Sequence, residues 1–551
     1  MPTFDAFLNG GLMITSACWM GLLLFAQVPP PAVAPEKVSE LRKEYEATIK
    51  RETDAITALA GKLQKQGKAK DAEECRRKID SPQSPDGASR FVPLLEVVPR
   101  RSKALANVPV KGAGAEPWRG ELDAIRETCG KALFEIAQKA AAKIPGQFAL
   151  ADQALRGVVA RLPDHPEARR LLGFVSYEGG WATPFAARLL RKKMINHPVF
   201  GWVEGSWVPH LDQGELPAPP TRGQQTLRWL PAEQADELHR PWESRWRIHT
   251  EHFDIHTNVK FSDAIAFGRQ LESFHELFLA LFADVLRLDH PDSLATRFKD
   301  KTKGKNLEAE RGLPPHQVYY FATKQEYVDH LSFLGDPNID KTLGRYLPPK
   351  PRQGNRAPAY LFHDPGGQLE VSATLFHEVS HQLLFESVGR SEFERNAGNY
   401  WVFEGLGTYF ETVSMLPDGS ILYGGRTSPR LEEARIRLVD RDELVPTETF
   451  VGFGQNEFNE DSVIYLHYAQ AMALTIYLMQ SDQAEHREAF LDYVKDAHKG
   501  RLRRDGGKSL RERIGISYSK LDRDLIRYLG GVEAGKEKAK DSEEAKKKGG
   551  D

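Results

Sequence analysis

The chain has 551 residues, of which 40% are hydrophobic and 28% are charged, an ordinary balance for a globular protein with a large core. Its 75 basic and 77 acidic residues give a formal net charge of -2, so charge gives no reason to expect a nucleic acid as a partner. The three cysteines, Cys18, Cys75 and Cys129, are too scattered for a disulfide framework or a cysteine-based zinc site.

Residues 1–35 form a separate N-terminal segment. The chain is mostly apolar from Phe7 to Val28 and then becomes proline-rich, as at the end of a secretory signal peptide. No Lys or Arg precedes the apolar run, which is nearly long enough to cross a bilayer. Three interpretations therefore stay open: a cleaved signal peptide, an uncleaved membrane anchor, and an N-terminal artefact or buried helix. The first two predict export to the periplasm or the cell exterior.

Residues 36–110 are predicted to be a helical hairpin followed by a linker. Leu41, Tyr45 and Ile49 recur at four-residue steps among charged residues, and Gly67 marks the turn of the hairpin. The pattern is typical of two helices that pack together with one solvated face.

Residues 111–200 are predicted to be an all-α module. The stretch 149–173 resembles a tetratricopeptide-type helical hairpin, with small Ala154 and Ala168 where two helices would approach closely. The usual role of such a module is to bind a protein partner or the neighbouring domain. We find at most two such units, so a long solenoid is not expected.

A second domain is predicted over residues 241–531, after a linker region at 201–240 whose first part, 200–221, is predicted to contain short extended pieces. Strand-like composition occurs at 246–258, 317–322 and 357–363, and almost everything after Leu369 has helical periodicity. These elements predict an α+β fold in which a small sheet lies above a mostly helical half. The final residues, 532–551, are charged, lack large apolar side chains and are predicted to be disordered.

One short segment carries the strongest chemical signal. His377, Glu378 and His381 form the pattern H-E-x-x-H in a stretch with helical spacing. Residues four apart lie on one face of a helix, so both imidazoles would point the same way and could share a zinc ion. Glu378 lies about 100° around the helix from His377, off the metal but near its water, where a general base belongs.

Catalytic zinc needs a third protein ligand and an open position. Glu404 follows His381 after 22 intervening residues and stands in the stretch YWVFEGLGTYFE. Gly398 and Asn399 mark a helix break just before it, so a second helix could bring Glu404 to the two histidines.

Together, H-E-x-x-H and W-x-x-E-G-x-x-x-Y-x-E, which begins at Trp401, resemble the motifs of the gluzincin metallopeptidases over roughly residues 370–475. The resemblance implies a zincin-like catalytic domain with zinc held by His377, His381 and Glu404. The chain departs from the aminopeptidase form of the motif at Phe403 and lacks a G-x-M-E-N segment, so aminopeptidase activity is not implied. The layout also resembles an uncharacterised bacterial family of secreted peptidases with N-terminal helices.

The same resemblance assigns a role to Tyr468, which matches the place of a tyrosine that hydrogen-bonds the oxyanion. Tyr465 and His467 are the less favoured alternatives for this role. Glu411 could orient a ligand histidine, but a solvated carboxylate is the preferred interpretation. The histidines at 249, 252 and 256, and His363 with Asp364, are read as ordinary strand and turn residues.

These residues predict a zinc-dependent peptidase that acts on proteins or peptides. Zinc would lower the pKa of its water to about 7, Glu378 would move the proton, and Tyr468 would stabilise the oxyanion. Two alternatives remain. The chain could be a catalytically inactive metallopeptidase-like scaffold that binds a protein partner through its N-terminal helices, or a zinc hydrolase acting on a non-peptide amide such as a cell-wall crosslink.

Overall fold

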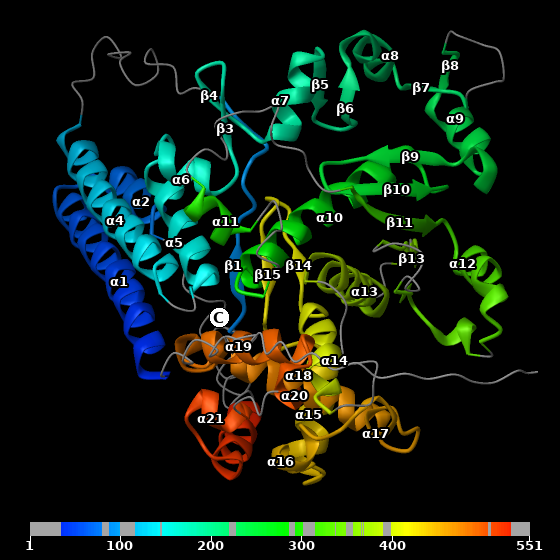
Figure 1. Cartoon of the computed structure of the whole chain (residues 1–551). Helices are drawn as coiled ribbons and strands as arrows, with labels where there is room; N and C mark the ends of the chain where they lie inside the picture. The colour runs from blue at the N-terminus through cyan, green and yellow to red at the C-terminus, as the bar shows by residue number, and fades with distance from the viewer. Residues whose placement is uncertain are drawn as a thin grey trace, which may run out of the picture.

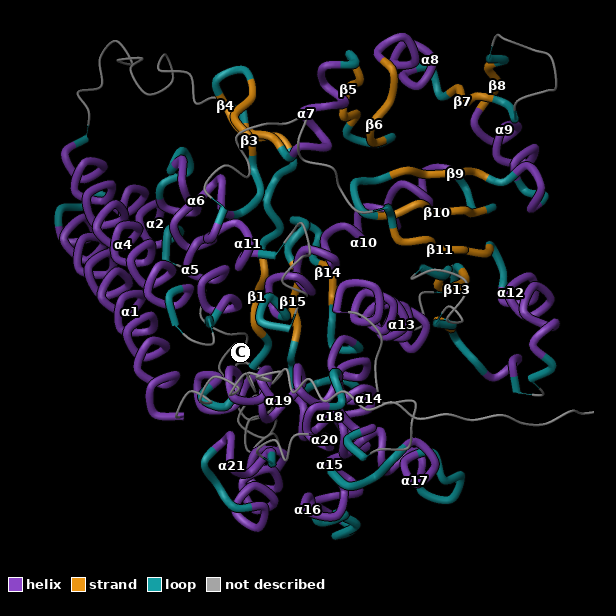
Figure 2. The backbone as a smooth tube through the Cα atoms, viewed as in Figure 1, coloured by secondary structure: helices purple, strands orange, loops and turns teal. Residues whose placement is uncertain are grey.

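The computed structural model describes residues 35–79, 87–99, 116–143, 146–219, 227–285, 293–300, 314–336, 338–348, 356–364, 366, 369–388, 398–504 and 509–530. Helices predominate and the sheets are small, as Figure 1 and Figure 2 show. The chain is therefore a mixed α+β protein, and the predicted fold class is confirmed at that level.

The N-terminal part is a group of packed helices. α1 (Pro35–Lys65) and α2 (Ala69–Arg76) contact each other as the expected hairpin, and Gly67 turns the chain between them with a φ of +78°. The next helices are α4 (Pro117–Ala141), α5 (Phe148–Arg161) and α6 (Pro166–Leu171). α5 and α6 are the helix pair expected over 149–173.

The expectation of a purely helical region up to residue 200 is wrong, and so is the expectation of a linker without regular structure up to residue 240, whereas the short extended pieces expected at 200–221 are found. Between Glu178 and Gly179 a tight turn with φ values of 46° and 79° reverses the chain into a β-hairpin. Farther on, the Trp229 ring stacks on His210 and meets Trp207 edge-on, so aromatic packing folds the supposed linker. The elements found are β1 (Ser89–Phe91), β2 (Val97–Val98), β3 (Val175–Tyr177), β4 (Gly180–Ala182), α7 (Pro184–Arg191), β5 (Met194–His197), β6 (Gly201–Glu204), α8 (Val208–Asp212), β7 (Glu215–Pro217), β8 (Trp229–Pro231) and α9 (Ala232–His239).

The largest sheet has five strands in the order β12-β13-β11-β10-β9. β10, β11 and β13 run parallel in its centre, and their apolar residues are buried, while β9 and β12 are antiparallel edge strands. The strands predicted at 246–258, 317–322 and 357–363 are confirmed, the first of them as a hairpin. The bounds are β9 (Trp246–His249), β10 (Phe253–Thr257), β11 (His316–Phe321), β12 (Arg345–Tyr346) and β13 (Ala359–Phe362).

Helices cover this sheet and connect its strands. α10 packs on β9 and β10 and meets α13 through Phe274 and Phe376, whose ring centroids lie 4.9 Å apart. α13 also contacts both β13 and the edge strand β12. The bounds are α10 (Phe261–Leu281), α11 (Leu294–Lys299), α12 (Lys324–Leu331) and α13 (Leu369–Val388).

The C-terminal half is built around the buried helix α18. α14 packs closely on it, because a Cβ atom at Gly405 would lie 2.4 Å from Thr475 Oγ1 and 3.0 Å from the Ala471 carbonyl oxygen. The elements are α14 (Tyr400–Phe410), β14 (Ser414–Met415), β15 (Ile421–Tyr423), α15 (Pro429–Arg435), α16 (Thr447–Phe450), α17 (Gln455–Phe458), α18 (Ile464–Gln480), α19 (Arg487–His498), α20 (Arg501–Arg504) and α21 (Leu510–Ile514).

The N-terminal part is bound to the rest of the chain at several points. β1 joins the hairpin β14–β15 as a third strand, as Figure 1 shows for the blue strand beside the yellow pair. On α1, the Arg42 Nε donates to Glu488 Oε1 of α19 at 2.8 Å, and both side chains are buried. Asp284 accepts a hydrogen bond from the Ala149 amide at 3.1 Å, at the start of α5. These contacts make the two parts one packed body.

Both ends of the chain lie outside the described residues, including the apolar stretch Phe7–Val28 and the predicted tail at 532–551. Of the helices within the described ranges, none combines the length and apolarity needed to cross a bilayer.

Candidate metal centre

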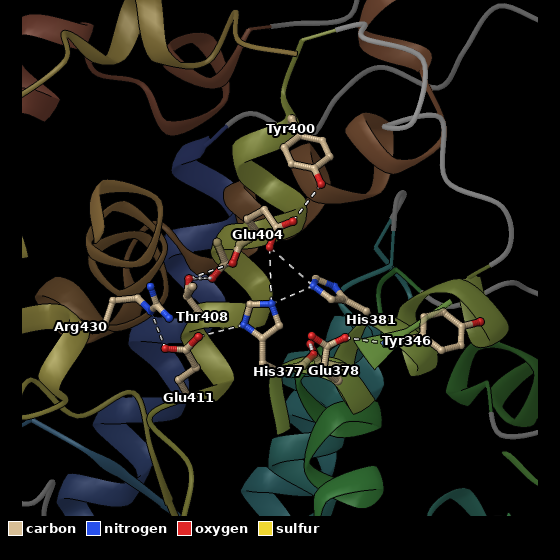
Figure 3. Close-up of polar contacts among 11 residues, drawn as sticks. Tyr346, His377, Glu378, His381, Tyr400, Glu404, Thr408, Glu411 and Arg430 are labelled. Carbon is tan, nitrogen blue, oxygen red and sulfur yellow. Dashed lines mark hydrogen bonds and ion pairs between the residues drawn. The ribbon is translucent and has the colours of Figure 1, made fainter. Parts of the chain in front are cut away.

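α13 presents two histidines side by side. His377 and His381 are one helical turn apart, and their Nε2 atoms lie 3.0 Å from each other with the rings nearly perpendicular (Figure 3). Val379 and Leu383, on other faces of the helix, are fully buried. The prediction that the two imidazoles share one face is therefore confirmed.

α14 brings Glu404 to these histidines. The chain enters this helix through Gly398 and Asn399, whose φ values of 79° and 62° make the predicted break. Glu404 Oε2 then lies 3.5 Å from His377 Nε2 and 3.7 Å from His381 Nε2. The close approach depends on Gly407, because a Cβ atom there would lie 2.7 Å from the His377 ring.

These three atoms fit a metal ion. Two imidazole nitrogens facing each other at 3.0 Å share a proton in one N–H···N hydrogen bond, and when both are deprotonated their two lone pairs converge on one point where a metal ion fits. The three separations define a triangle whose circumscribed circle has a radius of about 2.0 Å, close to the usual zinc–ligand distance of about 2.0–2.2 Å. The group is buried, and its two imidazoles and one carboxylate form a ligand set found in catalytic zinc sites.

The same geometry shifts the pKa values of the group. Burial alone would lower the pKa of His377, but hydrogen bonds to the Glu404 and Glu411 carboxylates raise it to about 10. Burial opposes ionisation of Glu404, yet its hydrogen bonds with the two imidazoles hold its pKa well below the usual range. The pocket therefore favours a carboxylate with a positive charge beside it.

Glu411 binds His377 through the ring nitrogen that faces away from Glu404 and His381. Its Oε1 accepts a hydrogen bond from His377 Nδ1 at 3.0 Å, and its Oε2 accepts one from Arg430 Nε at 2.6 Å. The preferred interpretation of Glu411 as a solvated carboxylate was therefore wrong, because seven residues along α14 return the side chain to the face of Glu404. Nothing in the sequence pattern indicated Arg430, which comes from α15.

His381 is supported differently. The Phe403 ring stacks on its imidazole at 3.8 Å between centroids, with the planes 11° apart. His381 Nδ1 is buried and has no hydrogen-bond partner among the residues that the structure describes. Phe403, the residue that departs from the aminopeptidase motif, thus covers a candidate ligand with an apolar ring.

Tyr400 is a site residue that the sequence interpretation missed. Its hydroxyl donates to Glu404 Oε1 at 2.9 Å, while Glu404 Oε2 is the oxygen that faces the histidines (Figure 3). A tyrosine four residues before a metal-ligating glutamate on a helix shares its face, so the spacing could have indicated this contact.

Glu378 lies next to the histidines and binds the edge of the large sheet. Its Oε2 accepts a hydrogen bond from the Tyr346 amide of β12 at 2.7 Å (Figure 3). Gly344 permits this approach, because a Cβ atom there would lie 3.2 Å from Glu378 Cγ. Glu378 is half-buried between the candidate metal ligands and the edge strand β12.

Of the three residues considered for oxyanion binding, only Tyr468 contacts the site. Burial, the charge of Glu404 and a hydrogen bond with that carboxylate raise the pKa of Tyr468 well above its usual value, so its hydroxyl stays protonated. Tyr465 is 71% exposed on the first turn of α18. His467 is buried among phenylalanine rings, and its Nδ1 donates to the Phe458 carbonyl at 2.8 Å.

A second group, His252, Glu272 and His275, has atoms close enough to suggest a metal site. Its imidazoles stack at 3.9 Å with planes 21° apart, so one ion cannot lie near both ring planes. Both Glu272 oxygens already accept hydrogen bonds from His252, through its backbone amide and Nδ1. The other histidines bind neighbours: His249 and His256 approach Asp254, and His363 Nδ1 is bonded to the Tyr320 hydroxyl.

Comparison with known proteins gives one family match. Residues 371–501 match a family model described as a protein of unknown function, DUF1570. The matched stretch is less than half of the chain but contains all three candidate ligands together with Glu378 and Tyr468. No curated protein matches the chain.

Proposed function

We propose that this protein is a zinc-dependent peptidase with a zincin-like catalytic domain, in which His377, His381 and Glu404 hold the metal. The observation that carries the proposal is the buried triangle of two imidazole nitrogens and one carboxylate oxygen, with Glu378 next to His377 on the same helix. The resemblance to the gluzincin motifs supports the same ligand set.

A zinc ion bound at this triangle supplies Lewis-acid chemistry, since it acidifies a water molecule and polarises a carbonyl group. Glu378 acts as the general base that takes the proton from the attacking water and delivers it to the leaving amine. The Tyr346 amide holds Glu378 Oε2 at 2.7 Å, so Oε1 is the oxygen that moves the proton.

Tyr468 acts on the opposite side of the reacting carbonyl. Its hydroxyl stays protonated because burial and the Glu404 charge raise its pKa, and it would turn from its hydrogen bond with Glu404 toward the oxyanion. A donor aimed at the developing oxyanion contributes about 3–4 kcal/mol to transition-state stabilisation. Glu411 and Arg430 hold His377 in the orientation that ligation requires.

The substrate is an extended peptide that pairs with β12 beside α13. β12 is one of the two edge strands of the five-stranded sheet and contacts α13 directly, so a peptide that pairs with this edge passes Glu378. Addition of a strand to a sheet edge supplies main-chain hydrogen bonds without strict sequence requirements. Export through residues 1–35 and a partner-binding role for the tetratricopeptide-like helices belong to the same proposal.

The test uses purified full-length chain, with bound zinc measured directly and hydrolysis followed on casein and a peptide library. We expect Glu378→Gln to keep zinc and lose hydrolysis by at least about 10²-fold, and His381→Ala to lose zinc. Full activity of Glu378→Gln would refute the proposed role of that residue. Zinc binding without any peptide hydrolysis would favour the inactive scaffold, or an enzyme for non-peptide amides if amide products appear from cell-wall material.

A further inference from the structure

The two oxygens of Glu404 have different neighbours. Oε2 faces the two imidazoles, whereas Oε1 accepts a hydrogen bond from the Tyr400 hydroxyl at 2.9 Å. Both residues lie on the same face of α14, one turn apart. Figure 3 shows one oxygen directed at Tyr400 and the other at the two imidazoles, so these contacts define the rotation of the carboxylate about its last bond.

Tyr400 is itself held rigidly. Its side chain is buried, and its ring packs edge-on against Phe458 of α17 with the centroids 5.4 Å apart. Its backbone amide donates to the Phe453 carbonyl at 3.1 Å. The preceding residue, Asn399, donates its amide to the Val451 carbonyl at 2.9 Å and accepts a hydrogen bond from the Tyr493 hydroxyl. The hydroxyl that meets Glu404 is thus fixed by three separate segments.

We infer that Tyr400 is a positioning residue that keeps Glu404 a one-oxygen ligand. With Oε1 bound to the tyrosine, only Oε2 reaches the cation, and the position that a second carboxylate oxygen would fill stays open. A catalytic zinc site needs that open position for water or substrate. The inference rests on the proposed function, because it assigns Tyr400 a role only if Glu404 is a ligand.

The consequence of removing the hydroxyl follows from the geometry of the carboxylate. In Tyr400→Phe the ring and its packing remain, while the hydrogen bond to Oε1 and the polar contacts of the hydroxyl with Gln455 and Asn459 are lost. The hydrogen bond with Tyr468 is then the tyrosine contact that Glu404 keeps, and the carboxylate can turn both oxygens toward the cation, which would raise the coordination number and close the open position. We expect the variant to retain the metal, while hydrolysis falls by about 10–100-fold, the range typical of residues that support a metal ligand.

The test replaces zinc by Co²⁺ in the full chain and records its visible absorption. Four-coordinate Co²⁺ absorbs visible light more strongly than five- or six-coordinate Co²⁺. We expect a strong band in the wild type and a weaker one in Tyr400→Phe. Tyr409→Phe is the matched control, because it also removes a buried tyrosine hydroxyl from α14. That hydroxyl accepts a hydrogen bond from Gln480 at 2.9 Å and does not bind Glu404.

The possible outcomes distinguish a failure of the role inferred for Tyr400 from a failure of the proposed zinc-dependent function. A weaker band in Tyr400→Phe with an unchanged band in Tyr409→Phe supports the positioning role. Equal spectra in wild type and Tyr400→Phe, with equal hydrolysis, would overturn the role of Tyr400 and leave the metal site standing. A wild-type protein that binds neither Co²⁺ nor zinc would overturn the proposed function itself.

Discussion

Replacing Gly407 by alanine tests how closely α14 must approach His377. The added Cβ atom would lie 2.7 Å from ring atoms of His377, whereas ordinary contacts begin at 3.4 Å. The ring must therefore move by about 0.7 Å, more than the roughly 0.2 Å by which metal–ligand distances usually vary. Displacements of about 1 Å at reacting groups cost about 100-fold in rate.

The effect on stability should be smaller than the effect on the site. Alanine gains about 1 kcal/mol over glycine in a helix, and overpacking costs about 1–3 kcal/mol, so the free energy of unfolding should fall by at most about 2 kcal/mol. Zinc affinity should fall at least about tenfold, measured by competition with a chelator.

Gly61→Ala in α1 provides the control, because nothing lies within 4 Å of a Cβ atom at that position. It should stabilise the protein by about 1 kcal/mol and leave zinc affinity unchanged. If Gly407→Ala bound zinc and cleaved peptides like the wild type, the inferred packing of α14 on His377 would be refuted.

Three further predictions follow from other contacts. Glu411→Gln should lower zinc affinity by about 10–100-fold, because His377 loses its charged acceptor; unchanged affinity in a chelator titration would contradict this. Metal affinity should rise about tenfold per pH unit from pH 7 to about pH 9, since the metal needs a neutral His377 and nearby carboxylates raise its pKa to about 10; a flat profile would argue against proton competition. Arg42→Met should lower the free energy of unfolding by about 3–5 kcal/mol, because it leaves Glu488 buried and unpaired. Adding Glu488→Leu should recover most of that loss in urea denaturation, and equal stability of Arg42→Met and the double variant would show that the unpaired carboxylate is not the cause.

The local part of the site could be predicted from the sequence because it depends on helical periodicity. His377 and His381 are four residues apart, and that spacing alone places both imidazoles on one face. Placing Glu404 beside them required more than periodicity, since its approach depends on the break at Asn399 and on a glycine at 407. Those residues were visible in the sequence, and the structure brings Glu404 to the histidines.

Contacts set by tertiary packing could not be predicted in the same way. β12 is two residues long, too short to show strand alternation, yet its Tyr346 amide binds Glu378. Arg430 reaches Glu411 from a different helix, and no sequence spacing fixes that distance. The strands before residue 200 were missed because each is only two to four residues long, and because glycines such as those in their turns also mark the ends of helices.

The contact between α1 and α19 sets an order for folding during synthesis. Arg42 and Glu488 are separated by 446 positions, so at about 5–20 residues per second the ribosome needs about 20–90 s to deliver the second after the first. During that interval α1 is without its buried partner charge, and β1 likewise waits for β15, which is translated more than 300 residues later. Such long-range pairing is slow to form and leaves apolar surface and an unpaired strand exposed on the nascent chain. The growing polypeptide should therefore depend on chaperones until α19 emerges.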